Sequence, residues 1–355
     1  MSSSQDVLKS FTIPLKDIKK STRNFSPKSR IGGGEFGVVY KGQVFKRWQN
    51  RIVAFKRFHP DGYEGDHEFR DEVVMIFNVN HDNIIPFIGY CKEAKQKIIV
   101  YEYAVNGSLD HHIQDPIKRR YLTWVQRLKI CIGAARGLEY LHSGIGVGET
   151  IVHRNIKGAN ILFDDNLEAK ICDFGLRLSP KTQLHSRNFT NYAGANFYMD
   201  PNYYESGVLK KESDIYSLGV VMFEILSGML ANEKRSIDDR SPKTLMNLVR
   251  QYYANGLEKV IDPCIKVQIG NHSLHMFKEV AYECISFRSK DRPTIGNIIK
   301  RMEEALDIQN HAATSTITIP SHIYQNLQRG LGKPCIFKTM DQLQALSHQA
   351  TNIKT

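Results

Sequence analysis

Apolar and polar residues alternate along much of the first third of the chain, which is the pattern of half-buried strands. The run Val38-Val39-Tyr40 follows a glycine-rich stretch, and the segments 51–56 and 97–103 are β-branched and apolar. Residues 64–79 have helical spacing instead. This part of the chain therefore predicts strands with one intervening helix.

A shorter amphipathic pattern precedes these strands. Its apolar positions predict a short amphipathic helix over 11–29, behind a disordered lead at 1–10. Those positions are Phe11, Ile13, Leu15, Ile18 and Phe25.

The pattern changes to a helical one after the breaker Asn106-Gly107-Ser108. Apolar residues then recur at three- and four-residue steps and predict a long one-faced helix, followed by helices near 212–228, 243–254, 274–286 and 294–306. A small β-rich lobe before a larger helical one is an α+β, two-lobe architecture. The residues of the long helix are Leu122, Val125, Leu128, Ile132, Ala135, Leu138 and Leu141.

These changes of pattern suggest domain boundaries. We expect a lead segment at 1–29, an N-terminal lobe at 30–103 and a C-terminal lobe at 104–306. The remainder, 307–355, is rich in Gln, Thr, His and Ser. It predicts an irregular tail to which no role can be assigned.

The positive net charge of the chain raises the question of whether it binds acidic partners. The chain has 355 residues and a net charge of +11, which suits acidic partners such as nucleic acid or anionic lipid. No run of five or more Lys or Arg concentrates this charge, so a solvated basic surface is the preferred interpretation. We expect no nucleic-acid partner and leave peripheral membrane association open.

The six cysteines and the N-terminus favour a cytoplasmic location. The cysteines are scattered without a C-x-x-C pair, which argues against zinc or a disulfide framework. Residues 1–6 lack the apolar core of a signal peptide, and Ser2 cannot be myristoylated. The apolar stretch Val220–Leu230 is too short to span a bilayer and carries Glu224.

The first chemical motif is the G-x-G-x-x-G-x-V pattern at Gly32, Gly34, Gly37 and Val39. Glycines let a backbone approach phosphates and donate N–H groups to them. Alone the motif is weak, because glycine-rich hairpins are common. A dinucleotide-binding turn needs a strand before it and a helix after it, whereas here a strand follows.

The second is Lys56 at the end of Val53-Ala54-Phe55-Lys56. A lysine there can hold the α/β-phosphates if a carboxylate fixes it, and Glu72 is the candidate, with Glu68 as the alternative. The competing interpretation is an ordinary surface ion pair, worth less than about 1 kcal/mol.

Two further motifs follow, His153-Arg154-Asn155 with Asn160, and Asp173-Phe174-Gly175. Asn160 and Asp173 are the oxygen ligands that Mg²⁺ prefers. The order and spacing of all these motifs are jointly very specific.

Together the motifs resemble the protein kinase family, and within it the plant receptor-like and receptor-like cytoplasmic kinases. The resemblance covers about residues 11–306 and extends to the lead segment, to Val100–Leu109 with Tyr101 as gatekeeper, to Ser213–Gly219 and to Arg292. It implies a bilobal fold that binds ATP and Mg²⁺.

The resemblance also implies roles for single residues. Glu102 and Tyr103 would form the hinge to adenine, Ala54 and Leu162 would enclose the ring, and Lys157 is typical of Ser/Thr kinases. The activation segment would carry phosphorylation sites at Ser179, Ser186, Thr190 and Tyr192.

Several positions depart from the family pattern. Asn155 stands where the family has the aspartate that accepts the substrate proton, and an amide is not basic. Ala195 replaces a bridging Thr and Phe197 replaces a groove-shaping Gly. Asn202 replaces the Glu that pairs with the late arginine, so we expect Arg292 to lose its buried partner.

Two neighbouring residues have alternative interpretations. Cys172 is expected to be a packing residue, with a reactive thiol as the alternative. His153 is expected to pack in the core and to hydrogen-bond toward Asp214, with a role as a base as the alternative.

The sequence thus predicts a pseudokinase that binds ATP and signals through protein partners, such as a receptor kinase. The alternatives are a working Ser/Thr kinase that tolerates Asn155, and a fold that binds no nucleotide and is purely structural.

Overall fold

The computed structural model describes residues 4–34, 37–44, 50–59, 66–144, 150–173, 197–238 and 240–316. The chain divides into two units, Met1–Gln309 and Asn310–Thr355. The first contains both lobes, and only the beginning of the second is described.

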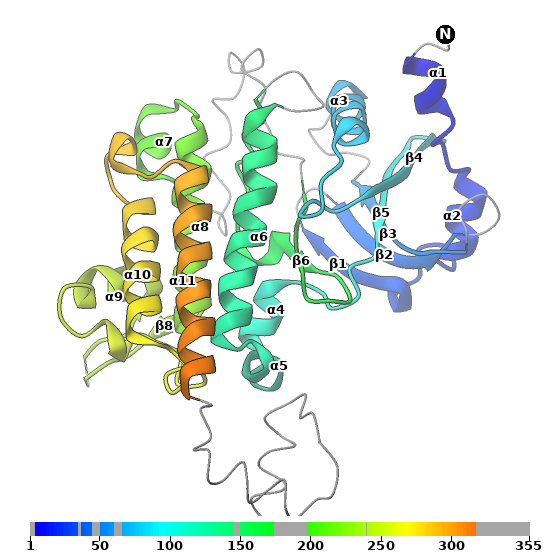
Figure 1. The fold of residues 1–355 in the computed structure, drawn as a ribbon. Helices are drawn as coiled ribbons and strands as arrows, with labels where there is room; N and C mark the ends of the chain where they lie inside the picture. Colours follow the sequence, from blue (N-terminus) through cyan, green and yellow to red (C-terminus); the bar gives the residue numbers. More distant parts are fainter. Residues whose placement is uncertain are drawn as a thin grey trace, which may run out of the picture. The chain divides into compact units, whose positions relative to one another are not determined.

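Five antiparallel strands form the sheet of the N-terminal lobe, in the order β1-β2-β3-β5-β4 (Figure 1). Alternation divides β3 between two faces: Val53 and Phe55 are buried in the core, whereas Ala54 and Lys56 line a cleft. The predicted strands and the predicted helix are confirmed, and β1 and β4 are additions. The elements are β1 (Arg30–Gly34), β2 (Gly37–Gln43), β3 (Ile52–Phe58), α3 (Asp66–Asn78), β4 (Phe87–Glu93) and β5 (Gln96–Glu102).

The lead segment packs on the sheet. Its helix α2 covers only Leu15–Ser21, so the predicted extent of 11–29 is wrong, and the expected disordered lead contains helix α1 (Ser4–Lys9). Ile18 of α2 is buried in one cluster with Phe55 of β3. Burial of these apolar side chains ties the lead to the N-terminal lobe.

The C-terminal lobe surrounds helix α8 (Lys211–Ser227), which is buried from Ser213 to Ser227. Helices α6 (Trp124–Ser143) and α10 (Asn271–Cys284) lie beside it (Figure 1). Helix α6, the predicted long helix, begins where the Thr123 hydroxyl accepts the Gln126 N–H and ends at Gly144, where φ is +72°. These features confirm the two-lobe α+β fold.

The remaining helices follow the predicted pattern to within a few residues, except the last. Helix α11 runs from Ile295 to Thr316, so the predicted irregular tail begins with helix instead. The other elements are α4 (Leu109–Gln114), α5 (Pro116–Tyr121), α7 (Pro201–Ser206), α9 (Leu245–Tyr252), the short strands β8 (Lys234–Arg235) and β9 (Lys243–Thr244), and the 3-10 turns Pro27–Ser29, Leu257–Lys259 and Ser289–Asp291. Within the described ranges, no helix combines the length and apolarity needed to cross a bilayer.

A small hairpin that follows helix α6 in the C-terminal lobe was not predicted. Strand β6 (Ile161–Phe163) pairs with β7 (Ala169–Ile171). Asn160 directly precedes β6, and Asp173 follows β7 by two residues. Antiparallel pairing therefore brings these two predicted metal ligands to the same end of the hairpin.

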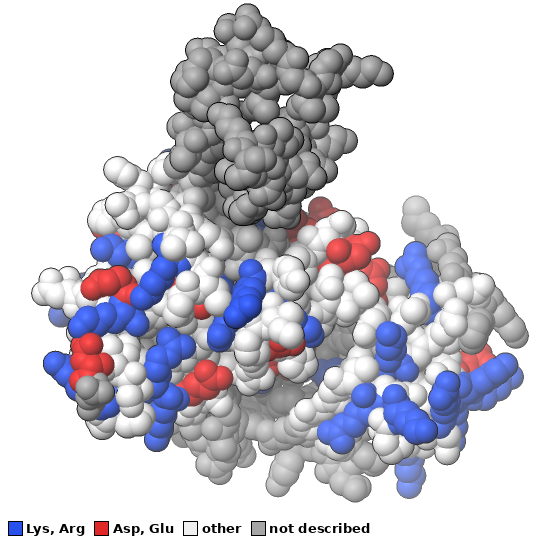
Figure 2. All heavy atoms as spheres, turned by 90° about the horizontal axis from the view of Figure 1, so that it is seen from below, with Lys and Arg blue, Asp and Glu red and all other residues white. Residues whose placement is uncertain are grey.

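The surplus of basic residues is distributed over the surface. Figure 2 shows Lys and Arg side chains across the face seen from below, on both lobes, with Asp and Glu side chains among them.

Arg292 has a buried partner, so the expectation that it lost one is wrong. Its guanidinium donates to both carboxylate oxygens of Asp200, at 2.8 and 2.6 Å. Both side chains are at most 3% exposed. Asp200 lies two residues before Asn202 and also caps helix α7 by accepting its N–H. A carboxylate from a neighbouring position therefore replaces the expected glutamate.

This pair generates a prediction for stability. Arg292→Met leaves the Asp200 carboxylate buried without its cation, which should cost about 3–5 kcal/mol of unfolding free energy. The measurement is denaturant unfolding followed by circular dichroism.

Arg136→Met is the matched control, because Arg136 meets Glu303 at the same 2.6 Å but both side chains are exposed. Its loss should cost about 1 kcal/mol or less. Equal destabilisation by the two substitutions would contradict the role given to the buried pair.

Candidate functional site

A cavity of about 1070 Å³, called here the interlobe cleft, lies between the sheet and the loops of the C-terminal lobe. It brings together predicted site residues that lie up to 141 positions apart in the sequence, from Gly32 to Asp173. The predicted site residues that line it are Gly32, Gly34, Gly37, Val39, Ala54, Lys56, Glu102, Tyr103, Asn155, Lys157, Asn160, Leu162 and Asp173.

The glycine motif forms the β1–β2 hairpin that covers the cleft. Gly34 pairs with Gly37 across it. A Cβ at Gly37, where φ is +155°, would lie 2.2 Å from the Arg57 carbonyl oxygen, so a side chain is excluded there. Among the residues that the structure describes, a Cβ at Gly34 would meet nothing within 4 Å. The backbone of Gly34 is thus open to the cleft, as a phosphate-covering loop requires.

Lys56 forms an ion pair with Asp173, its Nζ lying 2.9 Å from Oδ1. Its side chain is 11% exposed, so the interpretation as an ordinary surface pair is wrong. Glu72, its predicted partner, belongs to α3, but the side chains of Glu72 and Glu68 lie outside the described residues. The choice between them stays a prediction.

The second oxygen of Asp173 is also occupied. The side-chain amide of Asn155 donates to Oδ2 at 2.8 Å. Asn160 Nδ2 lies 3.5 Å from the same oxygen and donates to the Asn155 carbonyl at 2.7 Å. Burial raises the pKa of Asp173, but the charge and hydrogen bond of Lys56 outweigh this and hold it below its usual range. Asp173 is therefore an ionised carboxylate with a hydrogen-bond donor at each of its two oxygens.

Residues 151–160, called here the H-R-N loop, are anchored to helix α8 by Asp214. This fully buried carboxylate accepts the backbone N–H groups of His153 and Arg154, each at 2.8 Å. The ring of His142, which the sequence analysis missed, donates to it from α6 at 2.8 Å. The Asp214 carboxylate therefore fixes the backbone of the H-R-N loop to helix α8.

His153 packs in the core and its backbone N–H donates to Asp214, as expected. Its Nε2 lies 3.1 Å from the Cys172 carbonyl oxygen, and Nδ1 accepts the Asn155 N–H at 3.2 Å. These partners require the neutral tautomer with the proton on Nε2. Burial lowers the pKa of His153, which favours the same neutral form.

Cys172 lines the cleft, where the packing interpretation is favoured. Burial raises the pKa of its thiol, so the nucleophilic thiolate is disfavoured. The described cysteines 91, 131, 172, 264 and 284 are all free thiols.

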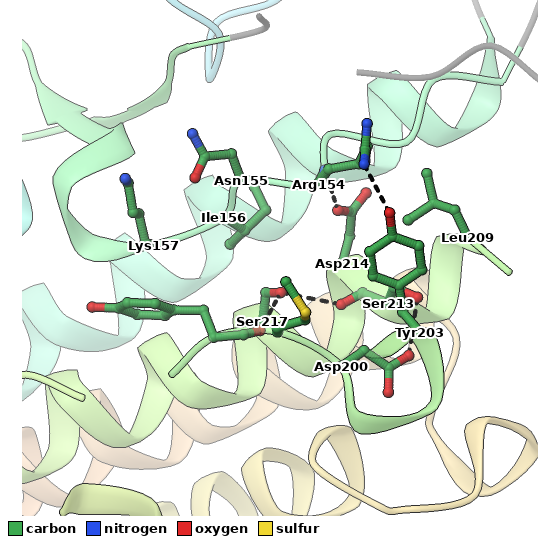
Figure 3. Close-up of a pocket in the computed structure, with 12 residues that line it drawn as sticks. Arg154, Asn155, Ile156, Lys157, Asp200, Tyr203, Leu209, Ser213, Asp214 and Ser217 are labelled. Atoms are coloured by element: carbon green, nitrogen blue, oxygen red, sulfur yellow. Dashed lines mark hydrogen bonds between the residues drawn. The ribbon is translucent and has the colours of Figure 1, made fainter. Parts of the chain in front are cut away.

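A second, small cavity of about 40 Å³ lies between the H-R-N loop, α7 and α8 (Figure 3). Arg154 lines it and donates to the Tyr203 hydroxyl at 2.8 Å. Figure 3 shows Asn155 and Lys157 extending from the same side of the loop. Phe197 is 37% exposed. The other residues predicted for this region, Ala195, Ser179, Ser186, Thr190 and Tyr192, lie outside the described residues.

Glu224 is a buried carboxyl group that the sequence analysis noted only as a polar interruption. Its Oε1 accepts from the Tyr198 hydroxyl and the Ala231 N–H, whereas Oε2 has no partner among the described residues. Burial raises the pKa of Glu224 to about 8, although both hydrogen bonds lower it. Its isolated position in the apolar run 220–230 is the sequence signal that could have identified it.

A divalent metal fits the cleft through a small protein ligand set. Asn160 uses Nδ2 for the Asn155 carbonyl, so its amide oxygen is the atom left to ligate a cation beside Asp173. The described residues contain no group of three or more His, Cys, Asp or Glu placed to hold a metal. A bound Mg²⁺ would therefore complete its shell with phosphate oxygens or water.

Comparisons with known proteins agree with this geometry. Residues 25–302 match the protein kinase domain family. The chain is 38% identical over 304 residues to a probable receptor-like protein kinase of Arabidopsis thaliana, 37% over 303 to receptor-like protein kinase HERK 1 and 38% over 314 to receptor-like protein kinase ANXUR2, both of the same plant. These alignments cover 84–87% of this chain but 35% of each relative. The chain thus spans about a third of the length of the relatives.

Glu224 generates a prediction about pH. The pKa of Glu224 is about 8 in the folded chain, above its ordinary value of 4.5. Between these two pH values the folded chain keeps a proton on Glu224 that the unfolded chain releases. Stability is then lost as pH rises toward 8, by up to about 1.4 kcal/mol per pH unit from this group. Glu224→Gln should flatten the decline in unfolding free energy between about pH 6 and 8.

Glu303→Gln, at an exposed glutamate, should leave the decline as it is in the wild type. Unfolding free energies measured at several pH values decide the matter. A slope that survives unchanged in Glu224→Gln would show that another group carries the pH dependence.

Proposed function

Because the chain belongs to the protein kinase family, we propose that it is an ATP-binding signalling domain whose own phosphoryl transfer is absent or weak. Protein kinases bind ATP together with divalent metal ions, and transfer depends mainly on positioning and electrostatic stabilisation. The observation that carries the proposal is the pairing of an Asn155 amide, rather than a second carboxylate, with Asp173.

The lining of the interlobe cleft supports the nucleotide half of the proposal. Lys56 would meet the phosphates below the open backbone of Gly34. Ala54 and Leu162 would enclose adenine, and Glu102 and Tyr103 would meet its edge with backbone groups, as the family resemblance implies. This supports nucleotide binding over a purely structural fold.

Mg²⁺ would be held by Asp173 and Asn160, and when bound it would neutralise charge on the phosphates. Lys56 orients the Asp173 carboxylate from one side, and Asn155 orients it from the other. Each of these contacts orients the carboxylate that would ligate the metal, without help from the nucleotide.

The acceptor side supports weak transfer. An Asn155 amide can orient a substrate hydroxyl but cannot take its proton, and general-base help is worth about 10²–10⁴-fold. Phe197 stands where the resemblance implies a glycine of the peptide groove, and Ala195 lacks the bridging hydroxyl. These residues disfavour a protein substrate more than they disfavour ATP.

The second candidate is a slow Ser/Thr kinase that transfers the γ-phosphoryl group of ATP to protein hydroxyls. The specific observation in its favour is the Lys56–Asp173 pair beside an H-R-N loop that Asp214 anchors. Lys157, which also lines the cleft, would be close to the transferred group.

Signalling through protein partners, among them a receptor kinase, is part of the proposal. We place it in the cytoplasm, where ATP is available and free thiols such as Cys172 are stable. The four hydroxyl residues of the activation segment, Ser179, Ser186, Thr190 and Tyr192, are candidate sites for phosphorylation by a partner.

The test is thermal melting of the full chain with millimolar Mg·ATP. At about 100 times its Kd a ligand adds about 2.7 kcal/mol, which should raise the melting temperature by several degrees. Lys56→Met should remove most of this shift. Lys170→Met is the matched control, because Lys170 is similarly buried and meets Asp164 away from the cleft.

The same proteins are then assayed for transfer of labelled phosphate from ATP to themselves and to a basic Ser/Thr peptide. Wild type should not exceed the Lys56→Met background. Robust Lys56-dependent transfer would establish the second candidate instead. A folded protein with no shift in Mg·ATP would refute nucleotide binding.

A further inference from the structure

The Asp173 carboxylate has a hydrogen-bond donor at each oxygen before any cation is considered. Lys56 donates to Oδ1 at 2.9 Å and Asn155 donates to Oδ2 at 2.8 Å. The Asn155 amide is oriented by this contact, because only its nitrogen can donate to a carboxylate. The backbone of Asn155 is fixed in turn, since its N–H bonds His153 and its carbonyl accepts from Asn160.

An aspartate at position 155 could not make this contact. It would place two carboxylates within hydrogen-bond distance, an arrangement that needs a shared proton or a cation between them. With asparagine the amide supplies the positive end of the interaction itself. The geometry of Asp173 is therefore maintained by protein atoms alone.

The charges lining the described part of the cleft point the same way. Three cationic side chains, Lys56, Lys118 and Lys157, line it together with three carboxylates, Glu102, Asp110 and Asp173. An aspartate at 155 would add a fourth carboxylate beside the place where the phosphates would lie. Metal-free ATP carries more negative charge than Mg·ATP, so such a cleft would repel it unless a cation accompanied it.

We propose that Asn155 makes the cleft a nucleotide site that does not require a divalent cation. The inference rests on the proposed nucleotide binding and deepens it: the ligand class is a nucleoside triphosphate with or without its metal. Asn155 is a positioning residue here. It orients Asp173, and because its amide is neutral it does not repel the phosphates as an aspartate would.

Calorimetric titration of ATP into the full chain, once with Mg²⁺ and once with EDTA, gives the ratio of the two Kd values. We expect the wild-type ratio to be less than about tenfold. In Asn155→Asp the ratio should rise by at least about another tenfold, because a unit charge a few ångströms from the phosphates is worth more than one decade in affinity.

Asn166→Asp is the matched control. Asn166 also donates its amide to a carboxylate, that of Asp165 at 3.2 Å, but in an exposed turn. It changes the net charge equally and should keep the wild-type ratio. Asn155→Ala removes the donor without adding charge and should fall between wild type and Asn155→Asp.

Melting temperatures in EDTA without nucleotide give a second readout. Asn155→Asp should melt below wild type, and Mg²⁺ should restore part of the loss. Adding Asp173→Asn to Asn155→Asp exchanges the amide and the carboxylate, so the double variant should melt above Asn155→Asp.

Equal Kd ratios in wild type and Asn155→Asp would overturn the inference and leave the proposed function standing. Loss of wild-type affinity in EDTA by far more than tenfold would overturn it as well. A protein that binds ATP in neither condition would refute the proposed function and this inference together.

Discussion

The buried carboxylate of Asp214 organises the centre of the molecule. A charge enclosed in helix α8 is stable only if it is fully hydrogen-bonded, and the groups that satisfy it are the backbone N–H of His153, the backbone N–H of Arg154 and the ring of His142. Hydrogen bonds to a charged group are worth about 1.5–3 kcal/mol each. The H-R-N loop is thus held to the most buried helix of the C-terminal lobe, and the positions of Asn155 and Asn160 follow from it.

A second carboxylate, that of Asp173, connects this anchored loop to the N-terminal lobe. Asp173 receives Asn155 from the anchored loop and Lys56 from strand β3. Lys56, Asn160 and Asp173 meet in the cleft as the family resemblance predicts, whereas an amide, Asn155, stands at the position of the expected base. An amide in place of a base would forgo about 10²–10⁴-fold of catalytic assistance. The proposed domain, which binds nucleotide and signals by shape, is consistent with both observations.

Much of this could be predicted from sequence, because motifs that carry chemistry keep their spacing. The patterns of residues 51–56 and 97–103 predicted strands, and Gly34, Lys56, Asn160 and Asp173 were expected to converge and do. The prediction that failed concerned a contact between side chains that are far apart in the sequence. Arg292 was expected to be orphaned, but Asp200 occupies the neighbouring position and reaches it.

Other contacts could not be predicted, because no periodic pattern in the sequence indicates them. His142 lies among apolar residues of α6, and only the fold shows that its ring meets Asp214. Glu224 stood out as a charge in an apolar run, yet its partners come from Tyr198 and Ala231. The Asn155 contact depends on which way an amide points, which is set by a carboxylate that lies 18 positions away along the chain.

The amide protons of Asn155 report this contact most directly. In protein labelled with ¹⁵N at asparagine and kept free of metal, the Asn155 side-chain signals can be assigned by their loss in Asn155→Asp. The account predicts that they exchange with water far more slowly than those of exposed Asn166, and that Asp173→Asn shifts them and speeds their exchange. Exchange as fast as that of Asn166, unaffected by Asp173→Asn, would contradict it.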